Sequence, residues 1–217
     1  MRYRAVVFDL DGTLVDSLSD LADSGNALLA LYGKPPHARD AYRYLVGNGS
    51  RTLMERLLPE EKDPVIEEAL AKYKEIYARS LFRQTKPYPG ILALLDELWQ
   101  RKIPMAVCTN KHPSAAETVI GTLFSPHLFT AYVGDRPGVP RKPDPANLLY
   151  VLETLGVPPE ETAYVGDTSV DMQTAVRAGA LPVGVLWGFR DKAELLANGA
   201  EVLLAHPAEL LEKVDFI

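Results

Sequence analysis

The chain has 217 residues, enough for one large domain or for a core domain that carries a smaller insert. Its hydrophobic content of 47% and charged content of 24% are those of an ordinary soluble globular protein. The formal net charge of −6 gives no support for a protein that binds nucleic acid or an acidic membrane.

Targeting signals and cysteine usage set the expected location. No run approaches the roughly 18 apolar residues that cross a bilayer. The segment before Asp9 holds only four consecutive apolar residues, too few for the apolar core of a signal peptide. The single cysteine, Cys108, leaves no internal disulfide and fits a reducing compartment. We therefore expect a cytoplasmic protein with no nucleic-acid or membrane partner. Its oligomeric state is expected to be a monomer or a homodimer.

Short apolar runs rich in β-branched residues recur along the chain and are predicted strands. They span residues 5–8, 103–108, 129–133, 162–165, 181–186 and 200–204. Helical patterns lie between most of them, for example over residues 91–99 and 148–155. Nearly continuous apolar strands that alternate with helices predict a parallel sheet covered on both faces. The expected fold class is therefore α/β, with a doubly wound, mostly parallel sheet.

One stretch, residues 18–86, breaks this alternation because it contains helix signals and no good strand. Its first apolar stripe ends at Gly33, and Asp63-Pro64 is predicted as an N-cap followed by proline at the first helical position. This pattern predicts a small all-helical domain inserted after the first strand. Residues 1–16 and 89–217 would form the α/β core, and residues 17–88 the insert.

Polar residues follow the predicted strands at the ends where open α/β sheets bind their ligands. These residues are Asp9, Asp11, Thr109, Asn110, Lys142, Asp167 and Asp171. Crowded carboxylates repel one another, so a cation is expected among them, and oxygen ligands favour Mg²⁺. A lysine and a hydroxyl group suit the oxygens of a phosphoryl group, and aspartate can accept phosphate covalently. The pattern predicts a magnesium-dependent site for phosphoryl transfer.

The same residues resemble the signatures of a known superfamily. Asp-Leu-Asp-Gly-Thr-Leu-Val-Asp-Ser at positions 9–17 resembles the first signature of the haloacid dehalogenase superfamily. Thr109-Asn110, Lys142-Pro143 and Gly166-Asp167 with Asp171 resemble the other three signatures, in the same order. The resemblance covers essentially the whole chain, and the helical insert is similar to the helical cap of that superfamily. Each motif alone could be a turn or a helix cap, whereas four in order are far more specific.

The resemblance implies a catalytic role for two aspartates. Asp9 would attack phosphorus, and Asp11 would protonate the leaving oxygen and later activate water. Phosphate binding is implied for Thr109, Asn110 and Lys142. The acid at position 11 is typical of the phosphatases and phosphomutases, because the dehalogenases need no acid or base there.

The resemblance also implies a set of metal ligands. Asp9, the main-chain carbonyl of Asp11, and Asp167 would hold Mg²⁺, and Asp171 would orient a water molecule bound to the ion. The segment Thr168-Ser169-Val170 departs from the more polar residues usual at this place in relatives. We expect this departure to leave the metal ligands unaffected.

Substrate choice is expected to lie in the insert, because the four motifs handle only phosphate. The loop over residues 46–51 is similar to the cap loop of phosphoglycolate phosphatases. Arg51 could offer a forked donor to a substrate carboxylate, Asn48 could contribute to the loop or to binding, and Ser50 could cap the next helix. The first candidate reaction is hydrolysis of 2-phosphoglycolate to glycolate and phosphate through an aspartyl-phosphate.

Other functions share part of this pattern. A phosphomutase or a pyrophosphatase of the same superfamily would have the same core residues and differ only in the cap. A phosphate-accepting receiver domain of a signalling protein also combines acids, a hydroxyl group and a lysine. Such domains are about half as long, lack the helical insert, and place the phosphorylated aspartate after a later strand.

Overall fold

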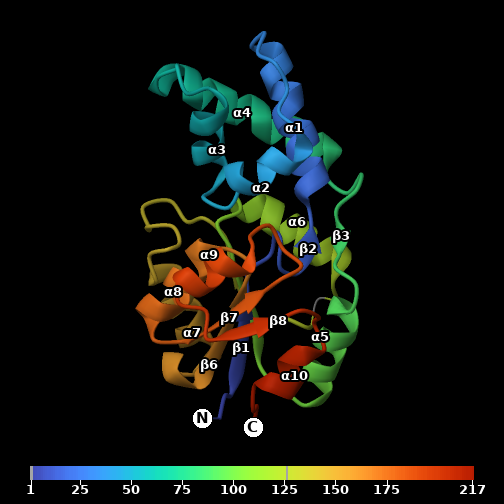
Figure 1. Cartoon of the computed structure of the whole chain (residues 1–217), viewed down its shortest axis with the longest axis vertical. Coiled ribbons are helices and arrows are strands. Elements are labelled where there is room, and N and C mark those ends of the chain that lie inside the picture. Colours follow the sequence, from blue (N-terminus) through green and yellow to red (C-terminus); the bar gives the residue numbers. More distant parts are fainter. Residues whose placement is uncertain (1, 126) are drawn as a thin grey trace.

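Strand β1 (Ala5–Phe8) is central to the protein, and its four apolar residues are completely buried. The computed structural model describes residues 2–125 and 127–217 (Figure 1). Within these residues six strands form one sheet, in the order β5-β4-β1-β6-β7-β8. The other five are β4 (Met105–Cys108), β5 (Ala131–Val133), β6 (Thr162–Gly166), β7 (Leu181–Val185) and β8 (Val202–Leu204). Every pairing in the sheet is parallel, as the sequence predicts.

Helices cover both faces of this sheet, because successive residues of a strand point to opposite sides. Val6 and Phe8 belong to one apolar cluster, whereas Val7 belongs to another. The first cluster includes residues of α5 (Ile91–Gln100), α6 (Pro113–Leu123) and α10 (Glu209–Lys213). The second includes residues of α7 (Ala146–Leu155) and α8 (Ser169–Ala178), and α9 (Lys192–Ala197) lies between β7 and β8 in the chain. The doubly wound α/β fold is thereby confirmed.

Four α-helices and one short 3-10 helix (Arg39–Ala41) between β1 and the rest of the sheet, which we call the helical segment, gather beyond one end of the sheet (Figure 1). The α-helices are α1 (Leu18–Leu31), α2 (Tyr42–Leu45), α3 (Ser50–Leu57) and α4 (Asp63–Ser80). A separate apolar cluster holds them together, with Tyr42 and Met54 completely buried in it. The chain enters and leaves through β2 (Val15–Asp16) and β3 (Lys86–Pro87), which pair antiparallel.

The observed boundaries differ from the predicted ones in places that have a physical reason. Strands β4 and β5 begin two residues later than predicted, because Ile103 and Phe129 are buried in the core without belonging to the strand ladder. Helix α4 begins at Asp63 itself with Lys62 as its N-cap, and the Asp63 carboxylate pairs with Arg51 instead of capping. Gly49, not Ser50, is the N-cap of α3. Within the described residues, no helix is long and apolar enough to cross a membrane.

Candidate active site

The residues that follow β1, β4 and β6 meet because these three strands are neighbours in the middle of the sheet. β1 lies between the other two, so Asp9, Thr109 and Asp167 all leave the sheet at the same edge. The Asp9 amide still donates to the Val165 carbonyl, at 2.9 Å, and this bond fixes the aspartate at the strand end. The sheet topology therefore assembles the site from three distant parts of the sequence.

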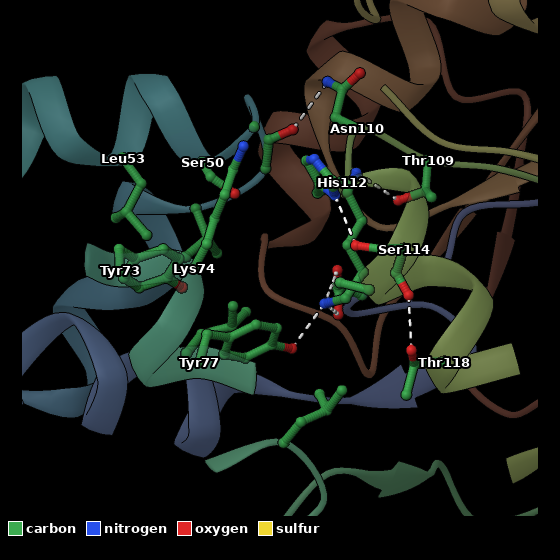
Figure 2. A pocket seen from close by; sticks show the side chains of 18 of the residues that line it. Ser50, Leu53, Tyr73, Lys74, Tyr77, Thr109, Asn110, His112, Ser114 and Thr118 are labelled. Carbon is green, nitrogen blue, oxygen red and sulfur yellow. Dashed lines mark hydrogen bonds and ion pairs between the residues drawn. The ribbon is translucent and has the colours of Figure 1, made fainter. Parts of the chain in front are cut away.

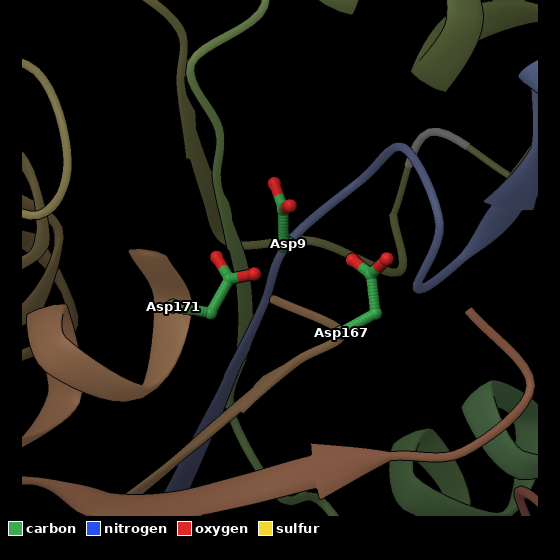
Figure 3. Close-up of side chains that lie close together, drawn as sticks. All are labelled: Asp9, Asp167 and Asp171. Carbon is green, nitrogen blue, oxygen red and sulfur yellow. The ribbon is translucent and has the colours of Figure 1, made fainter. Parts of the chain in front are cut away.

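Three carboxylates form a buried cluster at this edge: Asp9, Asp167 and Asp171 (Figure 3). Oxygen atoms of the three lie within 4.8 Å of one another. Asp9 is 8% exposed and the other two are completely buried. Burial raises the pKa of Asp9 to about 7 even though the neighbouring Lys142 lowers it. Burial, together with repulsion from Asp171 and Asp9, also raises the pKa of Asp167 well above its usual range.

Protein donors hold Asp167 and Asp171 differently. Asp167 accepts hydrogen bonds from Thr13 Oγ1 at 3.1 Å and from the Phe189 amide at 2.8 Å. Asp171 accepts from the amide and the hydroxyl group of Thr168, which also caps helix α8. Thr168, the first residue of the segment 168–170, is thus part of the structure that holds Asp171.

Gly12 lets the loop after β1 approach Asp167 closely. Its φ of +86° lies in the left-handed region, and a Cβ atom at this position would come within 2.2 Å of Asp167 Oδ2. No residue with a side chain fits here without moving the carboxylate. The glycine of the first motif is therefore required by the position of the fourth.

Lys142 balances part of the negative charge. Its Nζ atom lies 2.7 Å from Asp171 Oδ1 and 3.0 Å from Asp9 Oδ1. It also donates to the Tyr164 hydroxyl and the Cys108 carbonyl, so the ammonium is held from several sides. Burial lowers the pKa of Lys142, but Asp171 and Asp9 outweigh burial and raise it above its usual value. The lysine is a fixed cation between the two carboxylates.

The acidic cluster fits a hard divalent cation. Three carboxylates face one lysine, which leaves excess negative charge in a buried place. Asp9 Oδ1 lies near Lys142 without hydrogen-bond geometry, so it has no hydrogen-bond partner within the described part of the chain. An oxygen-only donor set with an unpartnered buried oxygen suits Mg²⁺. The Asp11 side chain lies outside the cluster and pairs with Lys111, and the prediction for Asp11 concerns only its main-chain carbonyl.

A cavity of about 320 Å³ opens beside the cluster, between the helical segment and the core (Figure 2). Asp9, Asp11, Thr109 and Asn110 line it, so four of the predicted residues share one space. The Asn110 side chain donates to the main-chain carbonyls of Lys142, at 3.0 Å, and of Gly47, at 3.1 Å. Asn110 thus joins the predicted phosphate-binding loops to the helical segment.

Lys111 is a site residue that the four motifs do not include. It follows Thr109-Asn110 directly, and its Nζ atom lies 2.9 Å from both carboxylate oxygens of Asp11. Its place immediately after the second motif was the available signal, because residues that follow a central strand face the ligand edge. The sequence alone does not show that it reaches across to Asp11.

Comparison with known proteins identifies the family of most of the chain. The family described as haloacid dehalogenase-like hydrolase matches residues 6–185. The chain belongs to this family. Its α/β fold is therefore that of a haloacid dehalogenase-like hydrolase.

Phosphoglycolate phosphatases are among its relatives in this family. One from Pseudomonas putida is 36% identical over 93% of this chain and 76% of its own length. One from Aquifex aeolicus is 32% identical over 98% of this chain and 97% of its own length. Among solved structures, a haloacid dehalogenase-like hydrolase from Streptococcus pneumoniae has a TM-score of 0.87 and 27% identity, covering 97% of both chains. A Thermotoga maritima structure provisionally assigned as a beta-phosphoglucomutase has a TM-score of 0.76 and 29% identity, covering 98% of this chain and 97% of its own.

Arg51 and Asn48, the two residues of the helical segment that the sequence suggests for substrate binding, are not among the residues that line the cavity. Arg51 forms ion pairs with Glu55, Asp63 and Glu67 on the surface of α3 and α4. Asn48 accepts a hydrogen bond from Arg56 at 2.8 Å. The structure therefore brings neither side chain to Asp9, and their role in substrate binding stays a prediction.

Proposed function

We propose that the chain is a magnesium-dependent phosphatase that converts 2-phosphoglycolate to glycolate and phosphate through an aspartyl-phosphate at Asp9. The observation that carries this proposal is the position of Asp9, which lines the cavity, belongs to the acidic cluster, and lies 3.0 Å from Lys142. The named relatives of the family support phosphoglycolate as the first candidate substrate.

The proposed reaction has two steps. A carboxylate oxygen of Asp9 attacks phosphorus, the bond from phosphorus to the glycolate oxygen breaks, and Asp11 gives that oxygen a proton. Asp11 then takes a proton from a water molecule that attacks the same phosphorus, and the bond to Asp9 breaks. Phosphate leaves, and both aspartates return to their starting forms. Thr109 would donate to the oxygens of the phosphoryl group during both steps. Lys142, whose three hydrogens go to Cys108, Tyr164 and Asp171, would attract the same oxygens through its charge.

The proposed ligands of the ion are Asp9, Asp167 and the main-chain carbonyl of Asp11. Asp171 suits the supporting role, because Lys142 and Thr168 already occupy its two oxygens. When bound, Mg²⁺ would offset the repulsion between the carboxylates and the phosphate dianion. Lys142 provides part of the same neutralisation from the protein itself.

We propose that residues 17–88 act as a cap over a core formed by residues 1–16 and 89–217. The separate apolar cluster of the helical segment and its narrow connection at β2 and β3 support this division. The cavity lies where the two parts meet, so the part of the substrate beyond the phosphate would contact the helical segment.

Two cavity residues, Lys74 of α4 and His112 before α6, are the better candidates to bind the substrate carboxylate. Figure 2 shows them on opposite sides of the cavity. No acid pairs with Lys74 in the described structure, whereas Arg51 is already engaged with three acids. Burial lowers the pKa of His112 and the nearby Lys74 lowers it further, so an anion between them would relieve this repulsion.

Phosphate release from a panel of phosphorylated metabolites, with Mg²⁺ and with EDTA, tests this proposal. We expect 2-phosphoglycolate to be among the best substrates and activity to require the metal. Asp9→Asn should remove turnover while the circular dichroism spectrum stays unchanged. Substantial hydrolysis by the folded Asp9→Asn protein would refute the assignment of the nucleophile.

The likeness to the Thermotoga maritima structure makes a phosphomutase the second candidate. The same panel distinguishes a phosphomutase from a phosphatase, because a mutase converts a sugar phosphate to its isomer and releases much less phosphate than isomer. Preferred cleavage of pyrophosphate would instead indicate a pyrophosphatase.

A further inference from the structure

The carboxylate of Asp11 is held by two residues: Lys111, in the loop after β4, and Ser17, directly after β2. Lys111 Nζ lies 2.9 Å from each Asp11 oxygen, and Ser17 Oγ donates to Asp11 Oδ1 at 2.6 Å. The Lys111 side chain is only 6% exposed and that of Asp11 19%. Both carboxylate oxygens are therefore fixed by donors, in a place largely shielded from solvent.

Lys111 is in turn held by a residue of the helical segment. It donates to the Tyr77 hydroxyl at 2.7 Å, and its Nζ atom lies 4.7 Å from the centre of the Tyr77 ring. Tyr77 belongs to α4 and stacks on Tyr73, with ring centres 5.9 Å apart and an angle of 5° between the planes. Figure 2 shows Tyr77 reaching from α4 toward the core side of the cavity. A chain of contacts thus runs from α4 through Lys111 to Asp11.

Lys111 could either bind the substrate or position Asp11, and the number of hydrogens it can donate distinguishes these two roles. An ammonium group has three hydrogens to donate. The two Asp11 oxygens and the Tyr77 hydroxyl are three acceptors for them. No donor remains for a substrate phosphate or carboxylate while these contacts persist. Lys142 meanwhile serves Asp9 and Asp171, so the two lysines of the site act on different aspartates.

We infer that Lys111 and Tyr77 are positioning residues, which hold the Asp11 carboxylate where it exchanges protons with the leaving oxygen and with water. This inference rests on the proposed function, because it assigns the support of the acid/base in that reaction. Proton transfer requires heavy atoms about 2.6–3.2 Å apart, so a carboxylate held by Ser17 alone would be misplaced for much of the time. It also follows that the position of α4 affects the acid/base and not only the shape of the cavity.

The test uses three substrates that differ in what they need from Asp11. 2-Phosphoglycolate and propyl phosphate have alkoxide leaving groups, which need a proton, and only the first carries a carboxylate. p-Nitrophenyl phosphate has a leaving group that departs without a proton. Single-turnover release of each alcohol or phenol reports the first step, and subsequent phosphate release reports the second step, which is common to all three.

For Lys111→Met we expect alcohol release from both alkyl phosphates to slow on the order of 100-fold. Release of p-nitrophenol should stay within about threefold of wild type, followed by slow phosphate release, so that a p-nitrophenol burst appears. Tyr77→Phe should give a smaller effect of the same kind, roughly 3- to 10-fold, because it removes one hydrogen bond to Lys111. Lys111→Arg should restore part of the rate, since a guanidinium can still donate to both Asp11 oxygens.

Tyr73→Phe is the matched control, because it removes a buried hydroxyl of the same helix that has no hydrogen-bond partner among the described residues. The ratio of alkyl to aryl rates should stay that of wild type in this variant. An equal loss of first-step rate for all three substrates in Lys111→Met and Tyr77→Phe would overturn the inference, as would a loss confined to 2-phosphoglycolate. If Lys111→Met does not fold, Lys111→Arg and Tyr77→Phe decide. Absence of phosphatase activity in the wild-type protein would refute the proposed function instead.

Discussion

Replacing Asp167 by asparagine should stabilise the metal-free protein while removing its activity. Asp167 is completely buried beside two other carboxylates, and both burial and those neighbours raise its pKa. A carboxyl group whose pKa is raised on folding destabilises the folded state increasingly as pH rises above the unfolded value of about 3.9. The amide carries no charge, so it escapes this cost at any pH.

Proton uptake limits how large the gain can be. The folded protein can avoid a buried charge by keeping Asp167 protonated. Because this carboxyl is ionised in the unfolded chain, keeping the proton costs about 1.4 kcal/mol for each pH unit above about 3.9, or roughly 4 kcal/mol at pH 7. Thr13 Oγ1 and the Phe189 amide both donate to Asp167. In asparagine one of these donors would face the side-chain NH₂, which is also a donor, and this mismatch costs about 1 kcal/mol. We expect a net gain of about 1–3 kcal/mol at pH 7, which raises Tm by roughly 3–10 °C. At pH 5 the gain should fall to about zero, because proton uptake there costs only about 1.5 kcal/mol.

Thermal unfolding in EDTA, followed by circular dichroism at pH 5 and pH 7, measures both values. Added Mg²⁺ should raise the Tm of wild type and leave that of Asp167→Asn nearly unchanged, because the variant lacks a proposed ligand. Asp171→Asn is the matched control with the opposite sign. It takes from Lys142 a buried partner at 2.7 Å and should destabilise the protein by about 3 kcal/mol. If metal-free Asp167→Asn is less stable than wild type at pH 7, the electrostatic reasoning fails.

Three further predictions concern other parts of the molecule. Lys74→Met should raise KM for 2-phosphoglycolate about tenfold or more without changing KM for propyl phosphate, whereas Arg51→Ala should change neither KM. Equal KM effects on both substrates would remove Lys74 from carboxylate binding. Gly12→Ala should lower Tm in EDTA and abolish stabilisation by Mg²⁺, because its Cβ atom would lie 2.2 Å from Asp167 Oδ2; an unchanged response to Mg²⁺ would contradict this. Burial raises the pKa of the Cys108 thiol to about 12, so a thiol reagent at pH 8 should modify the protein only after it is denatured; rapid labelling of the native protein would show that the thiol is accessible.

The alternation of strands and helices in the core could be predicted because its signals are local. Four consecutive apolar residues before Asp9 can form a fully buried strand, and residues that follow parallel strands must meet at one edge of the sheet. The order of the strands was not predictable in the same way, since it depends on which runs pair across the chain. The structure puts β4 and β6 on the two sides of β1, which brings Thr109 and Asp167 beside Asp9.

Local sequence is enough to predict the chemistry of the central site: aspartates, a hydroxyl group and a lysine in four ordered motifs, which are typical of a hydrolase that handles phosphate. The fold, in contrast, sets which charged side chains remain unpaired. Arg51 finds acids four residues along its own helix and on α4, so it is turned away from the cavity. Lys111, which follows β4, instead contacts Asp11 in the loop after β1 and Tyr77 on α4. Pairing between charges depends on distances through space, which packing of the helical segment against the core sets and local sequence does not.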